Sequence, residues 1–490
     1  MKNFVRMCII LSLVVCILAG MTACQKQDDT GLENIIFTYY VNSTIARDLR
    51  EVEAAINEIT EASIQVHVTL QPISLGTYNE QINLMLTSQE PMDVFAMSGT
   101  RFSSYVSNQQ CIPLDDLLSE HGQGILETVG REFLKGGSID GVTYGVMPLR
   151  DIAQGVGFYI RKDYVEKYGI DLSKVHTMQD VEPILAAIKA AEPDLYPLVV
   201  ENNVTLSPVE MCAGKDNVGD GYGVLPYSGD GTTIVNYYAT PEYRQSVETM
   251  HRWFQAGYIS PDSTTSTENI ATQMKADKGV CYFYKTKTGM DNQESKANNH
   301  EMVHADIVMP YISTMNAQLL TYGIAQQSEH PEAAMKFLNL LYSNPEVLNL
   351  LDWGIEGKHY VRTADGHITY PDGVDSTNSG YNMNMTWAFG NSFESYIWEG
   401  NDITIWDQAR NALANSQISP TMGFTFDNSN VKTELAALEN VAGEYRMGLE
   451  SGSMDPAKLD DFLSALEKAG VNQVIQEKQN QLDAWLKTGK

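Results

Sequence analysis

The stretch Asp140–Tyr164 reads D-G-V-T-Y-G-V-M-P-L-R-D-I-A-Q-G-V-G-F-Y-I-R-K-D-Y and contains two short apolar runs separated by a polar reversal. Its Asp140-Gly141 dipeptide is typical of a hairpin turn, and the run after it ends at Pro148, which is excluded from central strands. The second run, Val156–Ile160, is β-branched and aromatic, and a helical pattern follows it. The stretch therefore predicts a short strand, a crossover and a second strand.

Arg150 and Asp151 form a charged pair between the two runs. Charged pairs are usually solvated surface features, so the pair taken alone indicates an ordinary loop. If the chain passes here from one lobe to another, the pair lies at the mouth between the lobes and could contact a ligand or the opposite lobe. In that case we expect Asp151→Ala to weaken ligand binding without unfolding the protein.

Length and charge limit the class of protein. A chain of 490 residues exceeds the size at which one hydrophobic core keeps growing, so two lobes or domains are expected. Lys and Arg number 33 against 62 Asp and Glu, which gives a net charge of -29. Such an acidic surface repels nucleic acid and anionic lipid headgroups. We therefore expect no nucleic-acid partner.

The beginning of the chain has the pattern of a targeting segment. Lys2 and Arg6 form a positive region, and residues 7–18 are apolar. The run Gly20-Met21-Thr22-Ala23-Cys24 resembles a bacterial lipobox, with methionine where leucine is usual. A plain secretory signal with a chance cysteine is the alternative.

The resemblance to a lipobox implies a lipid anchor. We expect residues 1–23 to be a lipoprotein signal peptide, Cys24 to be the lipidated residue, and residues 24–32 to be a short tether. Two acyl chains are enough to hold a protein at a membrane. The protein is then expected on the extracytoplasmic face of the cell membrane.

The cysteines and aspartates give no sign of a bound metal. Cys111, Cys212 and Cys281 follow the targeting segment, and none belongs to a C-x-x-C pair. Their spacing suggests neither a disulfide framework nor a zinc site. The aspartates of residues 365–375 lack the loop-plus-glutamate pattern of a calcium site. We expect no metal and no cofactor.

The first part of the chain alternates strand and helix patterns. The expected elements, in the order strand, helix, strand, helix, strand, are Ile35–Tyr40, Ala46–Thr60, Ile64–Leu70, Tyr78–Ser88 and Val94–Met97. This order predicts an α/β unit with a parallel sheet. Ligands of such sheets meet the loops at the carboxyl ends of the strands, here residues 39–44 and 98–105.

A second α/β pattern follows the opening stretch. The expected helices and strands lie at residues 164–168, 181–191, 241–257, 279–284, 306–310, 318–325 and 331–343. Thr177 and Asp180 have the spacing of a capping box. The strand that ends at Pro310 and the run Asn344-Pro345-Glu346 are candidate return crossovers. The fold class is therefore α/β, with two lobes joined by a hinge of several segments.

Three segments resemble the extracellular solute-binding lipoproteins of bacterial ABC importers, in the branch that includes maltose-binding protein. They are Asp93–Tyr105, the D-G-x-x-Y-G pattern and following strand of Asp140–Asp163, and Tyr322–Leu338 with its P-E-A-A run. Leu351–Tyr360 and Trp387–Gly390 resemble a long-chain subset that has a C-terminal domain of undefined role. The resemblance implies the periplasmic-binding-protein-like (type II) fold.

The same resemblance implies a division of the chain. Lobe 1 is expected to comprise residues 33–147 plus 311–343, and lobe 2 residues 148–310 plus 344–490 with a C-terminal extension. The implied function is capture of a carbohydrate, an oligosaccharide in particular, by lobe closure and its delivery to ABC permease subunits. A monomer is expected.

Sugar binding needs flat aromatic faces and planar polar groups at loop mouths. The residues expected to contact the ligand are Tyr39, Tyr40, Met97, Ser98, Thr100, Arg101, Arg150, Asp151, Tyr282, Tyr284, Trp353, Glu356 and Tyr360. Each of them taken singly could equally be a packing residue. A peptide or amino-acid ligand is the alternative, in which Asp151 with Arg101 or Arg150 would bind the two charged ends.

Catalysis is the other class of function that we weighed. The sequence contains no G-x-S-x-G, H-E-x-x-H or P-loop motif, and its nine histidines are isolated. A glycosidase needs only two facing carboxylates, which sequence alone does not exclude. We expect a binding protein rather than an enzyme, with no catalytic residue.

Overall fold

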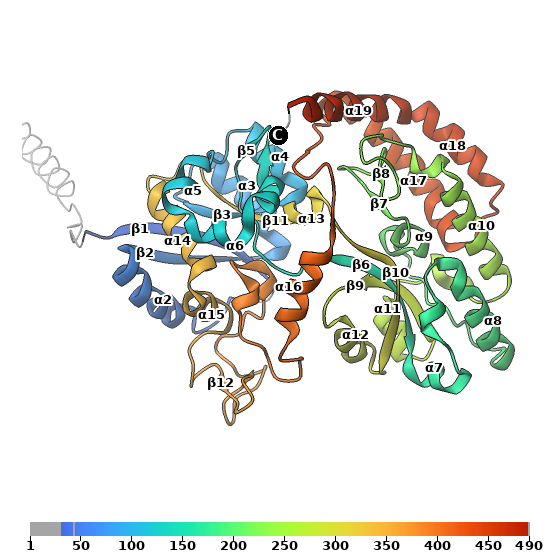
Figure 1. The fold of residues 1–490 in the computed structure, drawn as a ribbon, viewed down its shortest axis with the longest axis horizontal. Coiled ribbons are helices and arrows are strands. Elements are labelled where there is room, and N and C mark those ends of the chain that lie inside the picture. The colour runs from blue at the N-terminus through green and yellow to red at the C-terminus, as the bar shows by residue number, and fades with distance from the viewer. Residues whose placement is uncertain (1–30, 43–44, 489–490) are drawn as a thin grey trace, which may run out of the picture.

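The computed structural model describes residues 31–42 and 45–488, and these form two α/β lobes (Figure 1). Lobe 1 lies on the left of Figure 1 and lobe 2 on the right, with helix α16 (Ile405–Asn415) between them. Cys24 and the targeting segment lie outside the described residues. No helix in the described ranges combines the length and the apolar character needed to cross a membrane.

Lobe 1 is built on a four-stranded sheet in the order β11-β3-β1-β2. Its strands are β1 (Glu33–Val41), β2 (Val66–Ser74), β3 (Val94–Ser98) and β11 (Leu320–Ile324). Strand β1 pairs in parallel with β2 and β3, whereas β11 is antiparallel to β3. The helices α2 (Leu49–Ile64) and α3 (Leu75–Ser88) connect the parallel strands. The α/β unit predicted from the alternating pattern is confirmed.

The remaining lobe 1 helices cover the sheet and the start of the opening stretch. They are α4 (Phe102–Ser107), α5 (Asp115–His121), α6 (Gln123–Leu134) and α14 (Pro331–Ser343). Helix α14 has the bounds that the sequence predicts, because proline favours its first turn and Asn344-Pro345 ends it.

The opening stretch forms a hairpin and then a crossover. Strands β4 (Ser138–Ile139) and β5 (Val142–Thr143) flank Asp140 and Gly141, whose φ angles of 53° and 80° match a type I′ turn. The run that ends at Pro148 makes only a single bridge, between Val146 and Tyr322, rather than a strand. The crossover leads into β6 (Gln154–Arg161), as predicted.

Lobe 2 has a four-stranded sheet in the order β14-β10-β6-β9. The further strands are β9 (Cys281–Thr286), β10 (Met302–Ile312) and β14 (Gln417–Ile418). Strand β10 was predicted to end at Pro310 but continues to Ile312, because register shifts after Asp306 and Val308 accommodate the proline. Its helices include α7 (Lys162–Tyr168), α8 (Glu182–Ala191), α10 (Pro241–Gln255), α11 (Ile270–Lys275) and α12 (Met290–Asn298).

Residues 344–415 pack on lobe 1, which corrects the predicted division. Side chains of α15 (Pro345–Trp353), together with Phe389 and Ala409, belong to the hydrophobic core of lobe 1. The sequence pattern placed these residues in lobe 2, because Asn344-Pro345-Glu346 was interpreted as a crossover. Asn344 is instead a tight corner whose side chain accepts hydrogen bonds from the amides of Glu346 and Val347. Helix α15 stays on lobe 1 because Val347, Leu348 and Leu351 pack in its core.

The return to lobe 2 lies at residues 416–424, beside the second crossover at residues 313–319. The amide of Ser419 donates to the carbonyl of Ile312, and the Thr314 hydroxyl donates to the carbonyl of Thr421. Gln318 Nε2 donates to the Thr425 hydroxyl. Residues 313–319 and 416–424 therefore connect the lobes side by side and are joined by hydrogen bonds.

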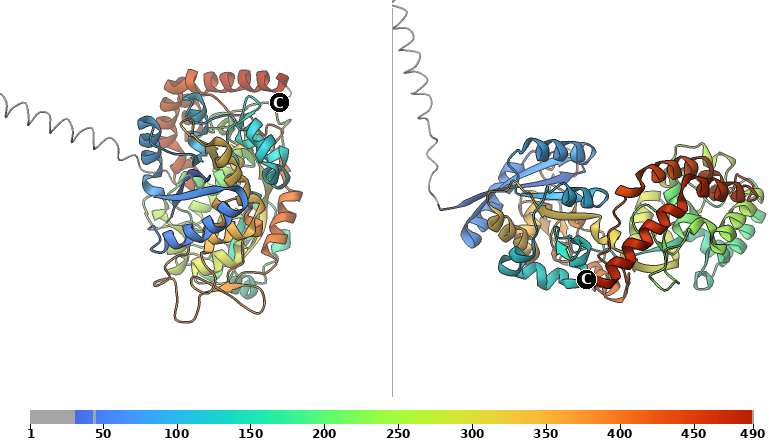
Figure 2. Two further views of the ribbon diagram at one scale, coloured as in Figure 1. Left: turned by 90° about the vertical axis from the view of Figure 1, so that its left-hand side faces the viewer. Right: turned by 90° about the horizontal axis from the view of Figure 1, so that it is seen from above.

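Three C-terminal helices cover lobe 2. They are α17 (Lys432–Ser451), α18 (Lys458–Ala469) and α19 (Val471–Thr488). Their apolar faces share one core with β6, β9 and α10. Figure 2 shows that α19 runs along lobe 2 and ends beside lobe 1.

Candidate functional site

A cavity of about 230 Å3 lies at the hinge end of the lobe 2 sheet. Gln154 opens β6 directly after the first crossover, and Tyr311 lies next to the end of β10, so both strands present this end toward lobe 1. Asn316 of the second crossover closes one side of the cavity. The cavity therefore faces the space where a ligand held between the lobes would lie.

Two tyrosines provide the flat surface of this cavity. The rings of Tyr227 and Tyr311 stack with centroids 3.7 Å apart and an interplanar angle of 18°. Burial raises the pKa of both phenols above the ordinary value, so each hydroxyl stays protonated at neutral pH. Such a pair offers an apolar face together with hydroxyl donors.

Charged and amide side chains form the other wall. Lys215 Nζ lies 2.6 Å from Glu210 Oε1 and 2.5 Å from Asn217 Oδ1. Only 6% of the Lys215 side chain is exposed, so this ion pair lies largely out of solvent. The cavity combines stacked rings with fixed polar groups, and this combination suits a polyhydroxylated ligand.

The edge of lobe 1 that faces lobe 2 carries exposed apolar side chains. Ile45 follows β1, Leu75 follows β2, and Leu319 accepts a backbone hydrogen bond from Gly99 at the end of β3. Their exposed fractions are 57%, 50% and 56%. Large exposed apolar side chains gathered at one edge mark an interaction surface. The loops at the carboxyl ends of these strands are those that the sequence pattern predicts to meet a ligand.

Several residues predicted for the lobe 1 wall lie in the core instead. Tyr39 and Met97 are fully buried, and Tyr40 is only 9% exposed. The Tyr39 ring packs against Phe389, and Tyr40 packs edge-on against Tyr78. Both faces of the lobe 1 sheet are covered, so consecutive side chains of β1 are both buried.

The residues after β3 lie at the predicted edge. Ser98 is half-buried and Arg101 is exposed. Thr100 lies in the short helix Gly99–Arg101, and its side chain is outside the described part of the structure. Contact of these three residues with a ligand stays a prediction.

Arg150 and Asp151 are not a solvated surface pair. Arg150 is 9% exposed, and burial lowers the pKa of its guanidinium. Asp151 Oδ2 accepts a hydrogen bond of 3.1 Å from the amide of Thr288 in lobe 2. Asp151 Oδ1 is buried and accepts no hydrogen bond from any described residue, and burial raises the pKa of this carboxyl. This hydrogen bond joins the first crossover to lobe 2, and contact of Arg150 and Asp151 with a ligand stays a prediction.

Asp151 lines a second cavity, of about 260 Å3, on the same hinge. Lys287 and α12 of lobe 2 form one side, and Trp406 of α16 forms the other. Asn292 Nδ2 of α12 donates to the carbonyl of Gly400, which is a contact between lobe 2 and the residues that pack on lobe 1. Asp151 thus lies where α12 of lobe 2 meets α16, which packs on lobe 1.

The remaining predicted residues have mixed positions. Tyr282 is fully buried, and its hydroxyl donates to Glu294, whereas Tyr284 is half-buried. Trp353 and Tyr360 belong to a small separate core with Trp398 and Ile368. Both side chains pack in this core, and their contact with a ligand stays a prediction.

Glu356 is exposed and pairs with Arg362 at 3.1 Å. This ion pair does not place it against either cavity described above, and its contact with a ligand stays a prediction.

The residues that line the first cavity were missed by sequence reasoning. Gln154 lies in the opening stretch, but Asn217 and Tyr227 lie in a glycine-rich segment without strong periodicity. A tyrosine between glycine-rich turns was the available signal. Nothing local to Asn217 or Tyr227 indicates that their segment is folded against distant helices.

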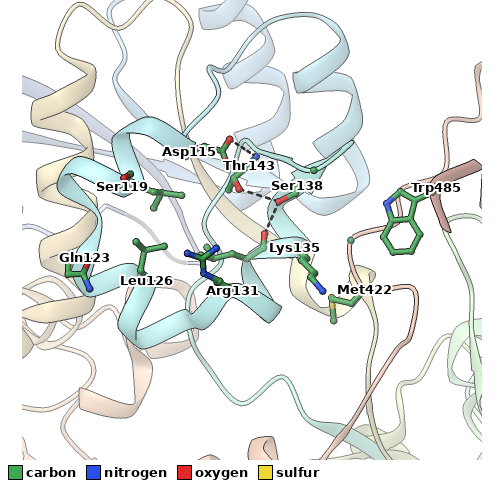
Figure 3. Close-up of a pocket in the computed structure, with 14 residues that line it drawn as sticks. Asp115, Ser119, Gln123, Leu126, Arg131, Lys135, Ser138, Thr143, Met422 and Trp485 are labelled. Carbon is green, nitrogen blue, oxygen red and sulfur yellow. Dashed lines mark hydrogen bonds between the residues drawn. The ribbon is translucent and has the colours of Figure 1, made fainter. Parts of the chain in front are cut away.

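A larger cavity, of about 590 Å3, lies between lobe 1 and the end of α19 (Figure 3). Trp485 approaches it from the side opposite Ser119 and Gln123, with Arg131 and Lys135 between them (Figure 3). None of the residues predicted to contact the ligand lines this cavity. It shows that the last helix reaches across to lobe 1.

Comparison with known families decides the class of the chain. The model described as "Bacterial extracellular solute-binding protein" matches residues 48–347. The chain belongs to this family. A second model, described as a domain of unknown function (DUF3502), matches residues 420–487 of this solute-binding protein. The family predicted from the sequence motifs is confirmed, including its C-terminal domain.

Relatives of this solute-binding protein extend over the whole chain. A protein of Streptococcus pneumoniae serotype 4 named "Carbohydrate ABC transporter substrate-binding protein" is 27% identical over 516 residues and is covered to 100%, as is this chain. The crystal structure of the N-glycan transport solute binding protein (NgtS) from S. pneumoniae is 25% identical, with a TM-score of 0.80 over 94% of this chain and 100% of that one.

A more distant structure has the same fold. The HMO binding ABC-transporter associated solute binding protein from Bifidobacterium longum infantis is 15% identical, with a TM-score of 0.64 over 92% of this chain and 99% of that one. The periplasmic-binding-protein-like (type II) fold is thereby confirmed for this solute-binding protein.

Proposed function

We propose that this protein is the substrate-binding subunit of a carbohydrate ABC importer and that it captures an oligosaccharide of the mannose-containing N-glycan class between its lobes. The observation that carries the proposal is the full-length similarity to the S. pneumoniae carbohydrate-binding protein. A structure of NgtS in complex with Man5GlcNAc is likewise 25% identical and covers 94% of this chain. Because this protein and its S. pneumoniae relatives align over nearly their whole lengths, we infer that they bind ligands of the same class.

The first cavity supports a sugar ligand. The half-buried Tyr227 offers a ring to the C–H face of a pyranose, the buried Tyr311 supports that ring by stacking on it, and Asn217 and Gln154 are planar amides suited to hydroxyl groups. Lys215 and Glu210 pair with each other, Lys285 is the remaining cation of the lining, and the lining residues include no further carboxylate to bind the amino end of a peptide. A neutral oligosaccharide fits these groups better than a peptide with two charged ends.

Two structures of the same relative support lobe closure as the mechanism. The TM-score of this chain is 0.80 against NgtS and 0.66 against its complex with Man5GlcNAc, at the same 25% identity. Because the relative is the same protein in both, a difference of this kind is what a movement of its lobes would produce. Closure requires that the ligand bind the closed arrangement more tightly, since only there do both walls contact it.

The location and partners follow from this role. Cys24 would anchor the protein through lipid on the extracytoplasmic face, where the closed form delivers its ligand to permease subunits. The protein is proposed to act as a monomer that binds its substrate without cleaving it. The cavities described above are assigned no catalytic group.

A thermal-shift screen tests the proposal. Residues 25–490 are incubated with Man5GlcNAc, other oligosaccharides and peptides, because a ligand present at 100 times its Kd stabilises a protein by roughly 2.7 kcal/mol. We expect a shift with Man5GlcNAc and none with peptides. Shifts with peptides alone would overturn the carbohydrate assignment, and release of cleaved glycan during the incubation would show an enzyme instead.

A further inference from the structure

The wall of the first cavity is formed mainly by residues 204–239, called the wall segment here. It supplies Thr205, Glu210, Lys215, Asn217 and Tyr227 to the cavity. Its regular structure is limited to α9 (Pro208–Met211), short 3-10 turns at its two ends, and the two-residue strands β7 (Lys215–Asp216) and β8 (Leu225–Pro226). A segment with so few backbone hydrogen bonds of its own needs contacts from other elements to keep one shape.

Helix α19 contacts the middle of the wall segment through buried polar groups. The Lys478 side chain is fully buried, and its Nζ lies 3.0 Å from Asp220 Oδ1 and 2.9 Å from the carbonyl of Gly223. The adjacent Gln479 accepts a hydrogen bond from the amide of Ile234 and donates one to the carbonyl of Thr232. A buried lysine is rare unless it is paired, so this one has a specific structural role.

Helix α17 contacts the part of the wall segment that bears charge. Arg446 Nη2 lies 3.0 Å from Glu210 Oε2, and Arg446 Nε lies 2.8 Å from Glu450 Oε1. Glu450 is fully buried and accepts hydrogen bonds from Ser207 and Tyr243. Glu210 also pairs with Lys215, so the charges that face the cavity are linked through Arg446 to the C-terminal helices.

The apolar side chains of the wall segment belong to the same core as these helices. Val224 and Leu225 share a cluster with Leu438 of α17 and Val474 of α19. Gly223 has a φ of 137°, and a Cβ there would lie 3.2 Å from a side-chain carbon of Ile475. The chain passes so close to α19 at this point that a side chain would displace it.

We propose that the C-terminal domain of residues 420–487 positions the wall segment against the ligand, with Lys478 and Arg446 as positioning residues. The proposal rests on the proposed function for the ligand, but its structural part concerns the wall segment alone. It gives a role to a domain whose matching family model has none.

Hydrogen–deuterium exchange tests the structural part without a ligand. In residues 25–490, Lys478→Met removes the buried ammonium and keeps the apolar stem, and Gln479→Ala is a milder change at the neighbouring position. Both variants are expected to exchange faster in residues 216–235, with the lobe 1 sheet unaffected. Arg244→Met is the control, because Arg244 pairs with Asp460 of α18 at 2.6 Å and does not touch residues 216–235.

Affinity for Man5GlcNAc, measured by calorimetry, tests the positioning role. If the wall segment holds its binding shape only a tenth of the time, the apparent Kd rises about tenfold. We expect about that loss for Lys478→Met, a smaller loss for Gln479→Ala, and none for Arg244→Met.

The outcomes separate this inference from the proposed function. Folded variants with unchanged exchange, or with faster exchange and unchanged Kd, would overturn the positioning role. If Lys478→Met fails to fold, Gln479→Ala decides by the same criteria. If the unmodified protein binds no glycan, the proposed function fails, while faster exchange in the variants still supports the structural part.

Discussion

In lobe 1 the surface that faces the other lobe is formed by the ends of regular strands, whereas in lobe 2 the strand ends share it with the wall segment. Strand β1 pairs with β2 at nine positions and with β3 at two, and β3 pairs with β11 at five, so the sheet itself fixes the ends of these strands. The wall segment takes its shape from side chains more than 200 residues further along the chain, such as Arg446 at a separation of 236 residues from Glu210. The comparison shows that the shape of one wall is set by its sheet and that of the other by buried polar contacts.

The largest expected effect is a loss of stability when a buried contact of the wall segment is removed. Arg446→Ala leaves Glu450 buried without its partner, and the loss of one member of a buried pair destabilises a protein by about 3 kcal/mol. Arg50→Ala removes a surface ion pair with Glu53 in lobe 1 and is expected to cost about 0.5 kcal/mol. Denaturant unfolding monitored by tryptophan fluorescence measures both. Equal losses would contradict the difference between the walls.

A second change tests the cavity rather than its support. Tyr227→Ala removes one ring of the stacked pair, and we expect the affinity for Man5GlcNAc to fall by about 2 kcal/mol, roughly 30-fold in Kd. Tyr370→Ala is the matched control, since Tyr370 is also half-buried but packs against Trp398 in lobe 1. Calorimetric titration gives both values. Similar losses in the two variants would remove the cavity from the binding site.

The smallest expected effect concerns the hinge between the walls. Asp151→Ala removes the hydrogen bond from the Thr288 amide, and we expect Kd to rise about fivefold with a stability change below about 1 kcal/mol. Asp163→Ala, which removes an exposed carboxylate at the far end of β6, is the control. An unchanged Kd for Asp151→Ala would show that its contact with lobe 2 does not affect closure.

The sequence predicted those helices and strands whose ends are set by residues close to them in the chain. The capping box of Thr177 and Asp180 is present, with reciprocal hydrogen bonds between their side chains and amides. Helix α14 and the strands of lobe 1 lie where proline, alternation and helical periodicity placed them. The crossover of the opening stretch was predictable for the same reason.

Features that depend on distant contacts were not predictable in this way. Nothing in residues 344–353 shows that Asn344 turns the chain back onto lobe 1, because its cap is a local contact compatible with either lobe. Tyr39 and Tyr282 lie at strand positions where aromatic residues suit both a core and a cleft. Tyr227 was missed because its place is set by contacts of the wall segment with α17 and α19.

Small-angle X-ray scattering of residues 25–490, with and without saturating Man5GlcNAc, tests most directly the claim that the two walls close on an oligosaccharide. We predict that the radius of gyration decreases when the glycan is added and that Tyr227→Ala requires a higher glycan concentration for the same decrease. Scattering that stays unchanged at saturation would contradict closure between the lobes.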